Sequence, residues 1–150
     1  MRTLGLAPHP EGGWYREWFR AAARVDTLDG RGPRSALTCI DFLLGAGQCS
    51  AWHRVASDEL WQLYEGRLRL WTMPASLDAI EVVELGEGGT ARRHAVPAGA
   101  WQAAEPIGEF AWVGATVGPG FEFADFAFLR DDAPALAALT RLRPDLLRLR

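Results

Sequence analysis

The sequence predicts an all-β protein, a single jelly-roll β-barrel, followed by a short C-terminal helix. Short segments rich in β-branched and aromatic residues recur about every ten residues, separated by glycines and prolines, as in antiparallel sandwiches and barrels. Helical periodicity is found only after Pro134. A chain of 150 residues is long enough for one domain with a substantial core.

The N-terminal half supplies the first strands. Residues 1–13 are expected to be irregular, because their prolines and paired glycines oppose regular structure. Strands are predicted at 14–20, 35–44 and 49–55, with a polar loop at 26–33 after the first.

The C-terminal half continues the strands and ends in the helix. Strands are predicted at 59–64, 67–73, 80–85, 92–96, 101–104, 110–117 and 126–130, with a hairpin turn at Glu65-Gly66. A helix is predicted from Pro134, because proline suits a first helical turn and Leu136, Leu139 and Leu142 form an apolar stripe. We expect one domain, 1–150, with the barrel at about 9–130 and the helical segment at about 133–150.

Composition narrows the class of function. The net charge is −3, without a cluster of basic residues, so nucleic acid is not an expected partner. All 16 basic residues are arginines, which excludes lysine Schiff-base chemistry. Cys39 and Cys49 lack metal-ligand or redox spacing. With neither a signal pattern nor an apolar run of about 20 residues, a cytoplasmic protein without a membrane partner is expected.

The segment from Gly47 to Gly66 is the strongest candidate for a functional site. It carries His53 and Glu59 on two predicted strands, whose alternating faces can direct both side chains into one cavity. Trp61 and Leu63 share the face of Glu59 and favour the barrel interior. A buried carboxylate must be paired, protonated or bound to a cation, and His53 or a substrate hydroxyl would serve as its partner.

Two chemistries are open for this pair. With Gln102, which follows the turn at Pro97 and Gly99, His53 and Glu59 could hold a weakly bound divalent metal ion, a poorer donor set than most transition-metal sites. Without a metal, an imidazole beside a carboxylate suits proton transfer. No cofactor is expected, and Gln102 would instead hydrogen-bond substrate oxygen.

Other residues near these motifs are candidates for ligand binding. Trp52, Trp61 and Trp101 could form a flat wall for a sugar or a nucleobase, although cores also need tryptophans. Arg54 could hold a phosphate or carboxylate, although a solvated strand face explains it equally well. The segments 9–17 and 118–126 are either turns or rims of the barrel mouth, and as rims would contribute Glu11 and Asp125.

These residues together resemble the cupin-5 family of small cupins, often labelled predicted sugar epimerases. The resemblance rests on five blocks in order: HPEGGWYRE, FLL, SAWHRVASDELWQLYEG, VPAGAWQAA and TVGPGFEFADF. A second histidine, usual in the first cupin motif, is replaced by Val55, as is normal in this family. The resemblance implies a jelly-roll barrel, commonly a dimer formed through its N-terminal and outer strands.

The epimerase label rests on likeness to nucleotide-sugar epimerases, which use a histidine base, a carboxylate behind it and a tyrosine acid. By position, this resemblance implies His53 as the base and Glu59 as the residue that orients it. Of the two tyrosines, Tyr64 has the opposite strand parity to Glu59 and is expected to face away. Only Tyr15 then remains.

Three hypotheses follow from the sequence. The first is a metal-independent isomerase or epimerase of a sugar, nucleotide sugar or similar polar metabolite. The second is a cupin that binds a small ligand without chemistry. The third is a metal-dependent cupin enzyme with an incomplete ligand set. A homodimer is expected in each case, because exposed edge strands can be covered by pairing.

Overall fold

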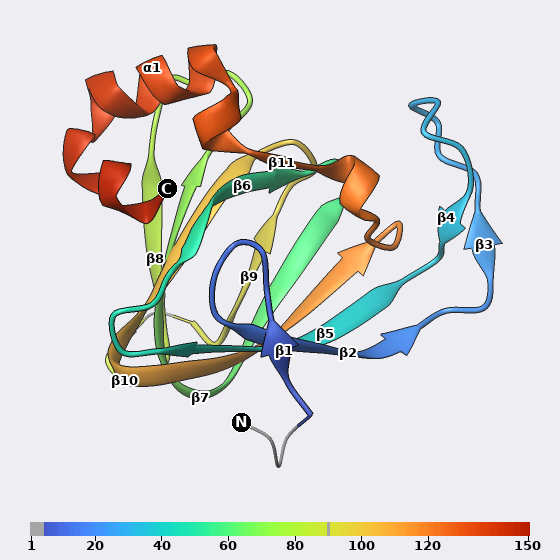
Figure 1. Cartoon of the computed structure of the whole chain (residues 1–150), viewed down its shortest axis with the longest axis horizontal. Coiled ribbons are helices and arrows are strands. Elements are labelled where there is room, and N and C mark those ends of the chain that lie inside the picture. The colour runs from blue at the N-terminus through green and yellow to red at the C-terminus, as the bar shows by residue number, and fades with distance from the viewer. Residues whose placement is uncertain (1–4, 90) are drawn as a thin grey trace.

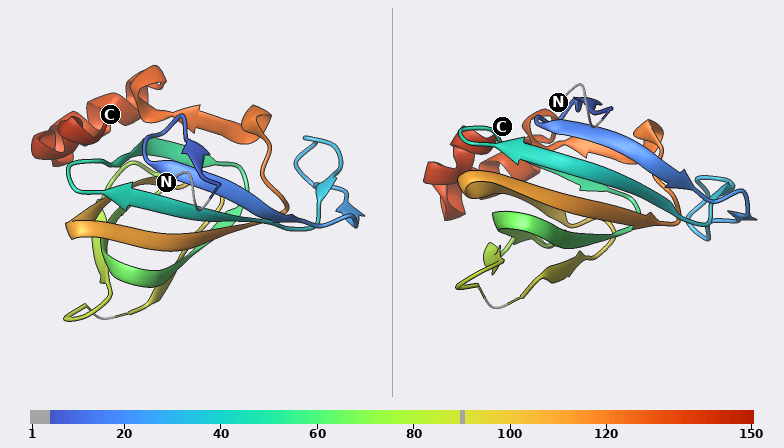
Figure 2. Two further views of the ribbon diagram at one scale, coloured as in Figure 1. Left: turned by 60° about the horizontal axis from the view of Figure 1, so that its bottom comes forward. Right: turned by 90° about the horizontal axis from the view of Figure 1, so that it is seen from below.

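The structure of the protein is a computed structural model that describes residues 5–89 and 91–150. Its main element is a curled antiparallel sheet of nine strands, which closes on itself as a barrel (Figures 1 and 2). The strands are β1 (Ala7–Pro8), β2 (Trp14–Arg20), β5 (Thr38–Gly45), β6 (Ser50–Val55), β7 (Asp58–Met73), β8 (Glu81–Leu85), β9 (Arg93–Val96), β10 (Trp101–Gly118) and β11 (Phe126–Phe128). The predicted all-β jelly-roll barrel is confirmed.

A small second sheet and the C-terminal segment complete the fold. β3 (Arg24–Val25) and β4 (Arg34–Ser35) form a two-stranded ribbon that projects from the barrel (Figure 1). The helix α1 (Ala133–Leu142) is flanked by 3₁₀ turns at Phe123–Asp125, Leu129–Asp131 and Pro144–Leu149. None of the described helices is long and apolar enough to cross a membrane.

Two long strands run where the sequence suggests four short ones. β7 spans both 59–64 and 67–73, so the predicted hairpin turn at Glu65-Gly66 is wrong. Gly66 instead has a φ of 82° and lies so close to β10 that a Cβ would be 2.2 Å from the carbonyl oxygen of Phe110. Four residues of β10, 107–110, oppose Arg67 alone in the register. This bulge bends both strands without ending them.

The two faces of the sheet carry separate apolar clusters. The inner cluster fills the barrel and includes Phe42, Leu44, Trp61, Leu63, Leu68, Leu70 and Val113. The outer cluster lies under the C-terminal segment and includes Trp52, Trp71, Met73, Trp101, Leu129, Leu139 and Leu146. Because side chains alternate along a strand, both clusters draw residues from the same strands.

The ends of the chain follow the sequence in part. The helix begins where predicted, and the side chain of Asp132 caps it by accepting the backbone N–H of Ala135 at 3.0 Å. The segment predicted to be irregular at 1–13 contains β1, which pairs with the start of β2; its residues 1–4 lie outside the described part of the chain. The strand predicted at 126–130 ends at Phe128.

Candidate active site

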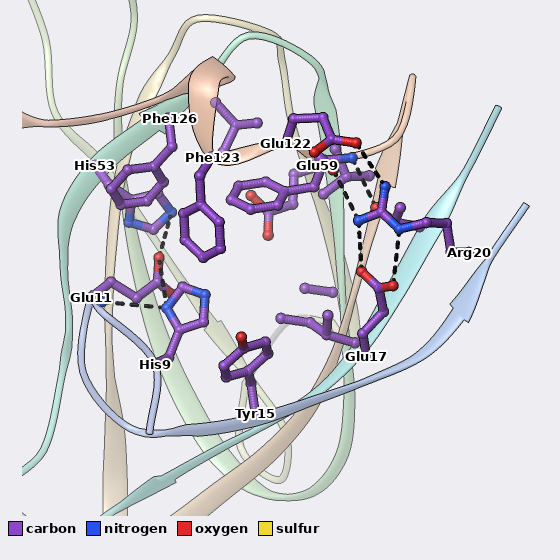
Figure 3. Close-up of a pocket in the computed structure, with 16 residues that line it drawn as sticks. His9, Glu11, Tyr15, Glu17, Arg20, His53, Glu59, Glu122, Phe123 and Phe126 are labelled. Atoms are coloured by element: carbon purple, nitrogen blue, oxygen red, sulfur yellow. Dashed lines mark hydrogen bonds and ion pairs between the residues drawn. The ribbon is translucent and has the colours of Figure 1, made fainter. Parts of the chain in front are cut away.

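A cavity of about 290 Å³ opens inside the barrel (Figure 3). It lies between the loop that precedes β2, the inner faces of β5, β6, β7 and β10, and the segment that precedes β11. Its polar lining comes from His9, Glu11, Tyr15, Glu17, Arg20, Thr38, His53, Glu59 and Glu122, and its aromatic lining from Phe121, Phe123 and Phe126. Both predicted catalytic residues, His53 and Glu59, therefore face one cavity, together with Glu11.

His53 is held on both of its ring nitrogens. Its Nδ1 lies 2.8 Å from the carbonyl oxygen of Ala51, an acceptor only, so Nδ1 carries a proton. Its Nε2 lies 3.2 Å from Oε2 of Glu11, and this contact needs one shared proton. Burial raises the pKa of Glu11 and lowers the pKa of His53. Both directions favour an uncharged pair, with the proton on Glu11.

The remaining contacts of Glu11 agree with this protonation. Ser50 donates its hydroxyl to Oε1 of Glu11 at 2.9 Å, which leaves Oε2 to donate to His53. The backbone N–H of Glu11 donates to Nδ1 of His9 at 3.3 Å. Burial lowers the pKa of His9, so a neutral His9 carries its proton on Nε2, the nitrogen that faces the cavity in Figure 3.

A glycine pair allows the loop to carry Glu11 into the barrel. Gly12 and Gly13 have φ values of 111° and 70°, a region that favours glycine. A Cβ on Gly12 would lie 2.1 Å from the carbonyl oxygen of Cys49. The loop is fastened to β6 by the backbone N–H of Ala51, which donates to the carbonyl oxygen of Glu11 at 2.8 Å. This segment, interpreted from the sequence as either a turn or a rim of the barrel mouth, forms a glycine turn that brings Glu11 to the cavity wall.

Glu59 is held from behind by a chain of two hydrogen bonds. Trp61 donates its indole N–H to Oε1 of Gln102 at 2.8 Å, and Nε2 of Gln102 donates to Oε2 of Glu59 at 2.5 Å. Because an indole can only donate, it fixes the Gln102 amide with its N–H groups toward Glu59. Gln102 and Trp61 are each 1% exposed, so they support Glu59 and do not line the cavity.

Glu59 is poised to change its charge near neutral pH. Its pKa is raised from 4.5 to about 7, chiefly by burial. The hydrogen bond from Gln102 lowers it. Its carboxyl group points into the cavity in Figure 3. A carboxyl with this pKa can take up or release a proton at physiological pH.

Aromatic rings cover the two histidines. Phe126 stacks on His53 with ring centres 5.2 Å apart and planes 17° apart, and Phe123 stacks on His9 at 6.3 Å. The ring of Tyr15 meets His9 edge-on at 4.6 Å, on the wall opposite Phe123 in Figure 3. Tyr64, in contrast, lies outside against Trp112 and is 44% exposed, as its strand parity predicts.

An ion-pair cluster occupies one side of the cavity (Figure 3). Arg20 donates to both carboxylate oxygens of Glu17, at 3.0 and 2.8 Å, and to Oε1 of Glu122 at 3.0 Å. A fourth hydrogen bond runs from Arg20 to the carbonyl oxygen of Phe121 at 3.2 Å. The cluster therefore joins β2 to the segment before β11.

Besides Gln102 and Trp61, four further residues predicted to bind substrate do not line this cavity. Trp52 and Trp101 are buried in the outer cluster, and the guanidinium of Arg54 lies 4.6 Å from the Trp101 ring, with Asp132 at 3.4 Å. Asp125 is paired with Arg31 and Arg34, at 2.9 and 2.8 Å. The alternation that turns His53 and Gln102 inward turns Trp52, Arg54 and Trp101 outward.

Sequence reasoning missed several cavity residues. His9 and Tyr15 stand in the same block as Glu11, but their role depends on a loop that folds onto β6. Phe123 and Phe126 follow the rigid turn at Pro119, and Arg20 ends the first predicted strand. Period-two alternation gives a signal for Tyr15 and for Glu17, which also lines the cavity. The other positions depend on tertiary approach.

The side chains of the described residues are poorly arranged for a metal ion: no three His, Cys, Asp or Glu among them could hold one together. The predicted donors are also engaged elsewhere: the amide of Gln102 lies between Trp61 and Glu59, and both ring nitrogens of His53 have partners. In this arrangement His53, Glu59 and Gln102 do not form the donor set that a transition metal requires.

Two solved structures are similar to the chain over almost its whole length. A hypothetical protein from Leishmania major is 31% identical, with 96% of this chain and 90% of that chain covered and a TM-score of 0.80. A protein from Shewanella oneidensis is 28% identical, with 99% and 92% covered and a TM-score of 0.78. A comparison with curated protein sequences gave no match.

A more distant likeness concerns the fold alone. A Bacillus subtilis oxalate decarboxylase variant is 17% identical, with a TM-score of 0.62, and the chain covers 37% of its length. The sequence itself matches the family described as cupin superfamily (DUF985), Cupin_5, over residues 1–129. Because this match spans well over half of the chain, the protein belongs to the Cupin_5 family of the cupin superfamily.

Proposed function

We propose that this protein is an acid–base isomerase or epimerase of a small polar carbonyl compound of monosaccharide size. One observation carries the proposal: Glu59, a buried carboxyl with a pKa of about 7, faces a cavity and is held from behind by Gln102 and Trp61. General acid–base catalysis favours a group whose pKa lies near the working pH.

Glu59, and not His53, is the proposed base. Nδ1 of His53 contacts the carbonyl oxygen of Ala51, and Nε2 contacts Glu11. Because both ring nitrogens have partners, neither is available to accept a proton from substrate in this arrangement. The roles that the sequence indicates are therefore exchanged. The neutral Glu11–His53 pair forms the wall beside Glu59.

The proton balance of the step is simple. Ionised Glu59 removes a proton from the carbon next to a substrate carbonyl, while a donor on the opposite wall protonates the carbonyl oxygen, giving an enol. Tyr15 and His9 supply donors on that wall (Figure 3). For the epimer, one of these donors protonates the carbon on the opposite face while the other takes back the proton of the enol oxygen, and Glu59 keeps the proton that it removed. For the isomer, Glu59 returns its proton to the former carbonyl carbon of an enediol, and the hydroxyl on the carbon that lost the proton gives its own proton to the opposite wall and becomes the new carbonyl.

The cavity volume supports a small substrate. At about 290 Å³, it lies at the lower end of the ~300–1,000 Å³ typical of ligand pockets. A monosaccharide matches this size, whereas a nucleotide sugar would place most of its atoms outside. Aromatic faces such as Phe123, which is 55% exposed, suit the apolar side of a sugar ring.

Deuterium exchange tests the proposal. Monosaccharides are incubated with the protein in D₂O, and NMR follows the loss of carbon-bound hydrogen next to the carbonyl. We expect exchange with the wild type and a loss of about 10²–10⁴-fold in Glu59→Gln. Glu109→Gln, at an exposed site outside the cavity, is the matched control. Binding without exchange would support the non-catalytic cupin instead.

Metal dependence is tested on the same protein. Elemental analysis of protein purified without chelator measures the metal content of wild type, His53→Ala and Glu59→Ala. Stoichiometric metal that both variants lose, with exchange that requires it, would replace the proposal with a metal-dependent mechanism.

A homodimer remains part of the proposal. The outer edge of β2 pairs with β1 only at Trp14 and Tyr15, while Trp18 and Phe19 beyond this point are 55% and 42% exposed. Two copies of such an edge can pair about a two-fold axis. Light scattering should give the mass of a dimer for the wild type and that of a monomer for Trp18→Glu.

A further inference from the structure

The charges that line the cavity bear on what it can bind. Among the described lining residues, four are glutamates and one, Arg20, is an arginine. The chain contains no lysine. The glutamates lie on two levels: Glu11 and Glu59 inside, and Glu17 and Glu122 beside Arg20 (Figure 3).

Arg20 has little capacity left for a ligand. A guanidinium has five N–H donors, and here four of them are used: three by Glu17 and Glu122 and one by the carbonyl of Phe121. Two carboxylates against one guanidinium leave this cluster with an excess negative charge. An anion that approached Arg20 would have to displace one of them.

Within the described part of the chain, the cavity lining beyond Arg20 offers no positive charge that would compensate the carboxylates. The Glu11–His53 contact shares one proton and is neutral as a pair, and His9 is held neutral by burial. The titratable and polar side chains that influence Glu59 from neighbouring strands and loops are His53, Gln102 and Glu11. The remaining wall is uncharged and consists of aromatic and aliphatic side chains together with Thr38.

We infer that the cavity binds uncharged or ammonium-bearing ligands of sugar size and excludes anions, and that Glu17 and Glu122 set this selectivity by occupying Arg20. The inference rests on the cavity of the proposed function and narrows its substrate class. Phosphorylated sugars, sugar acids and nucleotide sugars are excluded. Neutral sugars and amino sugars are admitted, since an ammonium group is attracted by the carboxylates and by aromatic faces.

Binding of matched sugars tests the selectivity. Isothermal titration measures sets made of a hexose, its 2-amino form and its 6-phosphate, at constant ionic strength. We expect that within any set that binds, the neutral and amino forms bind at least about tenfold more tightly than the phosphate, a difference of ~1.4 kcal/mol. A phosphate that binds as tightly as its neutral form would overturn the inference, and so would the absence of binding by every set.

A gain of function tests the role of the two glutamates. The double variant Glu17→Gln/Glu122→Gln frees the Arg20 guanidinium, and we expect the ratio of phosphate to neutral affinity to rise at least tenfold. Adding Arg20→Gln should remove that gain. The control Glu65→Gln/Glu109→Gln changes the net charge equally on exposed residues outside the cavity and should leave the ratio unchanged. An equal gain in this control would show a general charge effect and overturn the assignment.

The two proposals can fail separately. Neutral or amino sugars that bind without deuterium exchange would overturn the isomerase and leave the charge selectivity standing. Exchange catalysed on a sugar phosphate would do the opposite.

Discussion

Neighbouring residues of β6 face two different environments. His53 points into the cavity, where polar groups are joined by hydrogen bonds and one carboxyl can change its charge. Trp52 and Arg54, on either side of it, point outward to the cluster beneath the C-terminal helix. At this strand the inner face carries polar, titratable groups around a cavity, whereas the outer face carries packed side chains. A residue's distance along the chain from a motif is therefore a poor guide to whether it lines the cavity. The face of the strand on which it lies is a better one.

The largest expected effect is on the outer face. Trp101→Ala removes a fully buried ring and should lower the free energy of unfolding by about 3–5 kcal/mol, measured by urea denaturation. Exchange activity per folded molecule should persist, because Trp101 does not line the cavity. Leu28→Ala, at a fully exposed side chain away from both clusters, is the control and should change the unfolding free energy little. Loss of activity in folded Trp101→Ala would break the division between the two faces.

On the inner face, the titration of Glu59 should make the free energy of unfolding depend on pH. Glu59 has a folded pKa of about 7 against 4.5 for an ordinary glutamate, so the native state binds more protons between these values. Its contribution to stability is present below pH 4.5 and is lost as pH rises to 7, by roughly 3 kcal/mol.

Glu59→Gln isolates this contribution. Because the variant lacks the titrating group, its unfolding free energy relative to the wild type should increase from pH 5 to pH 8. Urea denaturation across this range provides the measurement. A constant difference between the two proteins would mean that Glu59 does not titrate in this window.

The support behind Glu59 gives a smaller effect. Gln102→Leu removes a hydrogen bond that favours the ionised carboxylate, worth about 1.5–3 kcal/mol for a charged acceptor. The pKa of Glu59 should rise by about one to two units, which would move the acidic limb of the pH–rate profile upward. Trp61→Phe leaves the Gln102 donor in place and should move it less. An unchanged profile in Gln102→Leu would contradict the positioning role.

The smallest effect is expected at Arg54. Arg54→Ala removes a contact with the Trp101 ring and a half-exposed ion pair with Asp132, and should cost about 1 kcal/mol of stability or less. Exchange activity and ligand affinity should be unchanged. A large loss of affinity would return Arg54 to the binding site that its sequence position suggested.

Local patterns were sufficient for much of the fold. Alternation placed β2 at Trp14–Arg20 with its observed bounds, and Pro134 marked the start of the helix. The same alternation placed Glu59 and Trp61 inside. The hairpin turn at Glu65-Gly66 was predicted wrongly because a glycine with positive φ occurs in bulges as well as in turns. Only the close approach of Gly66 to Phe110 distinguishes the two.

The site was predictable only where it is local. His53 and Glu59 share one motif, and strand parity orients both. The contact between Glu11 and His53 depends on a loop that folds back on β6. The ion pair between Asp125 and Arg31 joins residues 94 positions apart in the chain. Such partners depend on tertiary packing and leave no periodic trace in the sequence.

The two long strands, β7 and β10, connect the inner and outer apolar clusters. Each contributes residues to both apolar clusters, as Trp61 and Trp71 do on β7. Loss of pairing in either strand would therefore disturb both clusters, and we expect the strands to behave as one cooperative unit in amide hydrogen exchange. A ligand that binds beside Glu59 should then also slow exchange in the strands beneath the C-terminal helix, because it stabilises the folded state that both clusters share.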